Sequence, residues 1–201
     1  MYKEDYGNIP NKDKIISLLA SPKETFRGEW IIHSYILGAM AKNMAKDLGL
    51  DPDIAHACGA LAHIGKSLAK DGTYIIKGFN ILFKESYFFP AKIALSHAFY
   101  HMDLASFGLL SDLSQKDRDF VAKFLYKKGR DPYSDLVYMM DKYLMNEKDS
   151  YLRPKSSIYT YDKEDLTKDL KALEVSLTKP ISDYKPRLRT GKFPLSLFNP
   201  R

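Results

Sequence analysis

The segment from Asp51 to Lys66, DPDIAHACGALAHIGK, constrains the fold most, because nearly all of it is apolar or small until the final lysine. A helix with so little polar surface is normally buried on most of its circumference. Asp51 and Pro52 form a typical helix start, since aspartate caps the first turn and proline fits the first helical position. The segment therefore predicts a buried helix that closes near Gly65.

Helical periodicity dominates the rest of the chain as well. Between Glu29 and Leu48, apolar residues recur at spacings of three and four, and Gly49 is a favourable helix end. Ser114 and the acidic residues after it mark the start of another helix, which ends at Gly129. Further helices are expected at 73–84, 90–102, 132–148 and 162–178.

These patterns predict one all-α domain of about seven helices, without an internal repeat or a convincing hairpin signal. Residues 1–150 are expected to form the helical domain, and residues 151–201 a C-terminal helix plus an extended basic arm packed on it. The four prolines after residue 179 exclude a regular helix or a central strand there.

A length of 201 residues fits a single domain. No run approaches the roughly 18 apolar residues that cross a bilayer, and the first residues lack the apolar core of a signal peptide. Cys58 is the only cysteine, so no internal disulfide can form. We therefore expect a cytoplasmic protein with no membrane partner.

The net charge of +6 is partly local, because residues 179–201 carry six basic side chains and one acid. Such an excess favours anionic partners, including nucleic acid, although a solvated tail is the ordinary interpretation of a charge run. No basic stripe interleaved with aromatic residues strengthens the nucleic-acid alternative. The aromatic segment SYFFP, residues 86–90, is expected to be buried; if exposed, it would mark a contact surface, for example in a homo-oligomer.

The histidines are the candidate metal ligands. Histidines on helices can meet a carboxylate from another helix and hold a divalent ion, whereas any one of them alone is more typical of a hydrogen-bonded core or surface residue. His56 and Cys58 are expected to be structural. The five histidines are His33, His56, His63, His97 and His101.

The stretch from residue 33 to 72, HSYILGAMAKNMAKDLGLDPDIAHACGALAHIGKSLAKDG, resembles the opening of the HD-domain metal-dependent phosphohydrolases. In that family a first-helix histidine is followed by a Leu-Gly-Leu-Asp-Pro type of turn and a buried helix, which ends in a His-Asp pair before Ile-Gly-Lys. GFNILFKESYFFPAKIALSHAF and YMMDKYL look like later family segments. The resemblance spans about Arg27 to Glu147, and it implies an HD-domain-like helical bundle.

The His-Asp pair itself is degenerate. Without a gap, Ala62 stands at the family's His position and His63 at its Asp position; a one-residue deletion would instead keep His63 and remove the Asp. One carboxylate is missing in either register, and Tyr74 replaces a further family histidine. The resemblance thus implies two retained ligands, His33 and Asp141.

His33, His63 and Asp141 could still form a three-ligand site with open positions. Two neutral imidazoles and one carboxylate suit zinc, iron or nickel better than magnesium, and manganese remains a candidate. Four further residues are expected to contact a small phosphate-containing ligand, two of them basic and two of them histidines four apart on one helix face. They are Lys66, Arg27, His97 and His101.

Two functions follow from this reasoning. The first is a phosphohydrolase that acts on a nucleotide or another small phosphate ester, with an altered metal site. The second is a catalytically inactive HD-fold module that binds a phosphate-containing ligand or a protein partner, which Ala62 favours.

Overall fold

The computed structural model describes residues 1–22, 28–99, 102–129 and 131–146, and the structural statements below concern those residues. Seven α-helices lie in this part of the chain, and the only sheet there is one short antiparallel pair, so the all-α prediction is confirmed. The strands are β1 (Tyr2–Lys3) and β2 (Gly7–Asn8), and the helices are α1 (Lys12–Ala20), α2 (Glu29–Asp47), α3 (Pro52–Leu61), α4 (Tyr74–Lys84), α5 (Phe88–Ser96), α6 (Gln115–Lys128) and α7 (Pro132–Asn146).

Helices α2 and α3 form the centre of the bundle, and their backbones approach unusually closely. A β-carbon on Gly38 of α2 would lie 2.6 Å from the Ala60 β-carbon, and one on Gly59 would lie 3.0 Å from the Gly38 α-carbon. Small residues on both helices permit this contact. Eight of the ten residues of α3 are buried, which confirms the central buried helix.

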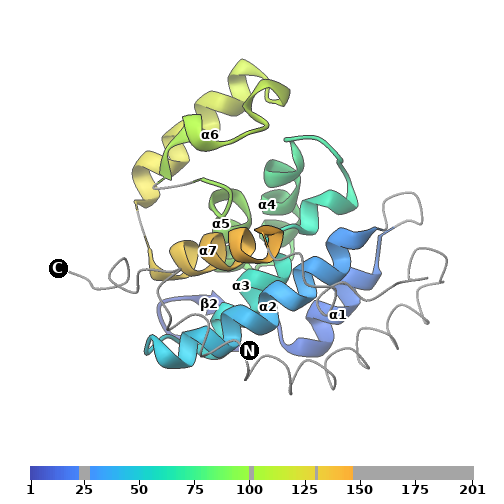
Figure 1. Ribbon diagram of the computed structural model, residues 1–201, viewed down its shortest axis with the longest axis vertical. Helices are drawn as coiled ribbons and strands as arrows, with labels where there is room; N and C mark the ends of the chain where they lie inside the picture. The colour runs from blue at the N-terminus through green and yellow to red at the C-terminus, as the bar shows by residue number, and fades with distance from the viewer. Residues whose placement is uncertain (23–27, 100–101, 130, 147–201) are drawn as a thin grey trace.

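The remaining helices pack around this centre in two groups, each with its own core cluster (Figure 1). One core cluster joins side chains of α1, α2, α3, α5 and α7 and includes Leu82 of α4, whereas a second cluster links α4, α5 and α6. In Figure 1, α6 lies at one end of the molecule, away from α1 and α2. Short 3-10 turns connect the elements: η2 (Ile64–Ser67), η4 (Leu104–Ser106) and η5 (Leu110–Asp112).

Several sequence predictions are wrong in detail. The β1–β2 hairpin and α1 were not expected; Asp5 and Gly7 both take positive φ in the turn, and Asn11 caps α1 through its side chain. The predicted buried helix stops at Leu61, because the chain tightens there into η2. The helix expected at 90–102 is α5, which begins at Phe88 and ends at Ser96.

Other predictions have mixed outcomes. In the segment SYFFP, Phe88 is 45% exposed, Tyr87 and Phe89 are half-buried and Pro90 is buried, so burial of the whole segment is wrong. The helix at 162–178 and the C-terminal arm lie outside the described residues. Within the described part of the chain, no helix has the length and apolarity needed to span a membrane.

Candidate metal centre

Three separate elements bring His33, His63 and Asp141 together. His33 lies on α2, His63 lies in the turn between α3 and η2, and Asp141 lies on α7. Atom Nε2 of His33 donates a hydrogen bond to Oδ1 of Asp141 at 2.6 Å, and Nε2 of His63 lies 3.6 Å from the same oxygen. The three side chains offer ligand atoms that all lie within 4.8 Å of one another, so they could hold a metal ion.

The local sequence explains why these residues meet. Gly65 follows His63 closely, and a β-carbon on Gly65 would lie 1.8 Å from the carbonyl oxygen of Tyr74. The absence of a side chain therefore lets η2 press directly against the start of α4. That contact fixes the turn that carries His63, while α7 packs beside α2 and presents Asp141.

Access to the cluster is asymmetric. The His63 side chain is 5% exposed and the Asp141 side chain 9%, whereas the His33 side chain is 25% exposed. Solvent therefore reaches the group from the His33 side. A buried carboxylate with one open approach is a suitable place for an ion or a polar ligand.

The protonation states suit a metal ligand set. Burial lowers the pKa of His63 well below its ordinary value, despite the opposing attraction of Asp141. Burial by itself raises the pKa of Asp141, but the hydrogen bond from His33 and the neighbouring imidazoles hold that pKa well below its usual range. At neutral pH His63 is thus neutral and Asp141 ionised, which are the forms that bind a metal.

His63 also has an unsatisfied polar atom. Its Nδ1 is buried and has no hydrogen-bond partner among the described residues. A buried polar atom without a partner costs about 1–3 kcal/mol, so a group that satisfies this ring would stabilise the protein. The 2.6 Å contact between His33 and Asp141, in contrast, is a hydrogen bond whose proton a metal would have to displace.

Tyr74 and His97 form a second layer behind the cluster. The Tyr74 ring stacks on His63 at 5.8 Å between centroids, and the His97 ring meets His63 edge-on at 4.7 Å. His97 contacts the Ala94 carbonyl oxygen through Nδ1 at 3.0 Å and the Tyr74 hydroxyl through Nε2 at 3.5 Å. The packing of Tyr74 on His63 was not predicted from the sequence, because it depends on how α4 lies against the turn that carries His63.

Lys66, a predicted phosphate contact, lies close enough to the cluster to sense the charge of Asp141. Its ammonium group lies 5.2 Å from the centre of the Tyr74 ring, over its face. Burial lowers the pKa of Lys66, and the charge of Asp141 partly restores it. His97 is only 1% exposed and packs behind His63. Arg27 and His101 lie outside the described residues, so their roles stay predictions.

The residues expected to be structural are buried. His56 is 8% exposed and packs its ring against Tyr35. Cys58 is fully buried, and this burial raises the pKa of its thiol, so a thiolate nucleophile is not favoured. Neither side chain belongs to the His33, His63 and Asp141 group.

Acid should destabilise the fold through the buried histidines. Burial lowers the pKa of His97 to about 4, below the unfolded value of about 6.5. The unfolded chain binds more protons between these values, so the stabilisation is complete above the unfolded pKa and is lost as pH falls toward the folded one. Going from pH 7 to pH 5 should cost about 2 kcal/mol of unfolding free energy from His97, and His63 adds in the same direction.

Denaturant titration of the chelator-treated protein at both pH values measures this loss. A His97→Gln variant should show a smaller dependence on pH, because the side chain no longer titrates. Equal stability of the original protein at pH 7 and pH 5 would contradict the lowered pKa of His97 in the folded protein.

Comparison of the chain with protein-family models, curated proteins and solved structures gives no match.

Proposed function

We propose that this chain is an HD-type, metal-dependent phosphohydrolase with an altered metal site, acting on a nucleotide or another small phosphate ester. The observation that carries the proposal is the convergence of His33, His63 and Asp141 from three elements into one buried group. The resemblance of the sequence to HD-domain enzymes supports it and supplies the reaction class.

The donor set fits a divalent cation. Two imidazoles and one carboxylate are typical ligands of zinc, iron and nickel, and Nδ1 of His63 has no hydrogen-bond partner among the described residues that binding would have to displace. When bound, such a cation supplies Lewis acidity toward a phosphoryl oxygen and lowers the pKa of water. His33, His63 and Asp141 would hold it.

The chain's own residues would bind and orient the substrate. Lys66 carries a positive charge beside the cluster and would neutralise a phosphate group there. The Tyr74 ring supports both Lys66 and His63 through face contacts, and it would hold these two side chains in fixed orientations. The open side at His33 would admit the ester.

A non-catalytic binding module is the second candidate, and a specific observation favours it. Ala62 is buried at the end of α3 and offers no ligand atom, so the group contains a single carboxylate. In addition, the His33–Asp141 hydrogen bond already satisfies Asp141 without an ion. In this alternative Lys66 would bind a phosphate-containing ligand without hydrolysis.

Metal content separates the two candidates. We expect elemental analysis to find about one zinc, iron, nickel or manganese ion per chain, and His33→Ala should remove it. His56→Ala is the matched control, because His56 is also a helical histidine but lies outside the group, and it should retain the metal. A screen of nucleotides and small phosphate esters on the loaded protein then tests hydrolysis.

The opposite results are equally informative. A protein that holds no metal after loading with each of the four ions would refute the phosphohydrolase proposal. A protein that holds metal through His33 but releases no phosphate from any ester would favour the binding module.

A further inference from the structure

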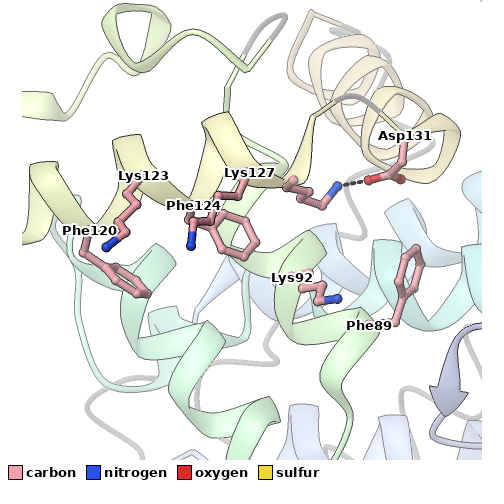
Figure 2. Close-up of a pocket in the computed structure, with 8 residues that line it drawn as sticks. Phe89, Lys92, Phe120, Lys123, Phe124, Lys127 and Asp131 are labelled. Carbon is pink, nitrogen blue, oxygen red and sulfur yellow. Dashed lines mark ion pairs between the residues drawn. The ribbon is translucent and has the colours of Figure 1, made fainter.

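A pocket between α5 and α6 is separate from the metal centre and shares no residue with it. Its volume is about 680 Å³, within the range of small-molecule sites. In Figure 2, Phe120, Lys123, Phe124 and Lys127 come from α6, and Phe89 and Lys92 come from α5. The pocket is lined by Phe89, Lys92, Phe120, Lys123, Phe124, Lys127, Lys128 and Asp131.

The two helices contribute alternating rings and amines. On α6, Phe120, Lys123, Phe124 and Lys127 follow one another at spacings of three, one and three residues, so they share a helix face. We expected no basic stripe interleaved with aromatic residues, but α6 carries a short one.

The charge of the pocket is strongly positive. Lys128 pairs with Asp131 and also donates a hydrogen bond to the Ser134 hydroxyl at 2.7 Å. Lys92, Lys123 and Lys127 have no ion-pair partner among the described residues. Three exposed ammonium groups around one concavity attract a ligand with more than one negative charge.

The pocket also has an apolar wall. Phe120 is 42% exposed, and its ring centroid lies 6.0 Å from that of Phe79, which also contacts Phe124 at 6.1 Å. These contacts fix the two α6 rings against α4. A ring held in place but half-open to solvent offers a face on which a flat group can stack.

We propose that this pocket binds a small nucleotide, with its phosphates between the lysines and its base on the phenylalanine rings. Three free amines exceed the single charge of a simple carboxylate such as a fatty acid, which makes a di- or triphosphate the better match. The pocket is much larger than an inorganic phosphate requires. A nucleoside could fill the remaining volume beside the phenylalanine rings.

Calorimetric titration of the full chain with ADP and with pyrophosphate tests the proposal in the presence of a chelator. We expect one saturable ADP site and affinity for pyrophosphate about tenfold or more weaker, because stacking of a base contributes about 1–3 kcal/mol. Lys123→Gln combined with Lys127→Gln should weaken ADP binding about tenfold. Phe120→Ala should reduce the preference for ADP over pyrophosphate.

Two controls locate the site. Lys116→Gln changes an exposed lysine on α6 that does not line the pocket, and it should leave ADP binding within about twofold of the original. Lys66→Gln, which removes the ammonium group beside the metal centre, should also leave ADP affinity unchanged; a loss there would place the nucleotide at the metal centre and overturn the proposal. Circular dichroism of each variant verifies folding.

Three further outcomes would overturn it. The first is the absence of saturable ADP binding. The second is an ADP affinity of the Lys123→Gln, Lys127→Gln variant equal to that of the original protein. The third is tighter binding of dodecanoate than of ADP. The last result would identify the pocket as a site for an apolar acid.

Discussion

Gly65→Ala should destabilise the protein by roughly 4 kcal/mol or more, enough to unfold a domain of ordinary stability. The new β-carbon would lie 1.8 Å from the Tyr74 carbonyl oxygen and 2.5 Å from the Gly78 nitrogen. Both are backbone atoms, so no side-chain rotation can relieve the overlap. Relief requires η2 to move away from α4, which would also move His63. Denaturant titration monitored by circular dichroism measures the change.

Gly108→Ala is the matched control for this substitution. A β-carbon at Gly108 would meet no atom within 4 Å, and its φ is not in the left-handed region. We therefore expect the unfolding free energy to change by no more than about 1 kcal/mol. The change is stabilising if alanine lowers the entropy of the unfolded chain. A Gly65→Ala protein as stable as the Gly108→Ala protein would show that η2 does not press on α4 as described.

Asp141→Asn should abolish metal binding while retaining the shape of the side chain. The substitution removes the only carboxylate of the group. Loss of an outer hydrogen-bond partner of a ligand already costs 10–100-fold in metal affinity or activity, so we expect a loss of about 100-fold or more for the ligand itself. Elemental analysis measures the first effect, and phosphate release from the best substrate measures the second.

The metal-free protein gives an independent measurement of the same residue. The hydrogen bond from His33 to a carboxylate is charge-assisted, and such bonds contribute about 1.5–3 kcal/mol. Asp141→Asn should therefore lower the unfolding free energy by about 2 kcal/mol in chelator. Asp119→Asn, on the exposed surface of α6, should change neither metal content nor stability. Undiminished metal content in Asp141→Asn would exclude this carboxylate as a ligand.

Local capping signals in the sequence predicted helix boundaries well. Ser114 accepts a hydrogen bond from the Asp117 backbone nitrogen at the start of α6, and Gly129 ends that helix at positive φ. Asp51 likewise caps α3 through the backbone nitrogens of Asp53 and Ile54. These interactions lie within a few residues of one another, so the sequence shows both partners together.

Features that depend on distant contacts were harder to predict. The apolar pattern of α5 continues beyond Ser96, yet the helix ends there and the chain turns, with Met102 at positive φ. Similarly, α3 stops short of Gly65 because that glycine contacts α4, an element that follows in the chain. Periodicity does not report such contacts.

The candidate sites were likewise only partly predictable from the sequence. The residues His33, His63 and Asp141 could be named from their types and from the family resemblance, and the structure places them together. The stacking of Tyr74 on His63 and the phenylalanine–lysine pocket could not, because both depend on how helices turn relative to one another. The metal itself and its chemistry stay predictions.

The origin of Asp141 on α7 has a consequence for the order of events during synthesis. His33 and Asp141 are separated by 108 positions. At a translation rate of about 5–20 residues per second, roughly 5–20 s pass between their additions to the growing chain. Throughout that interval His33 lacks its carboxylate partner, and so does His63 once it has been added. Assembly of the centre is therefore a late step on the ribosome, and a nascent chain halted before α7 would contain most of the bundle without the ion-binding group.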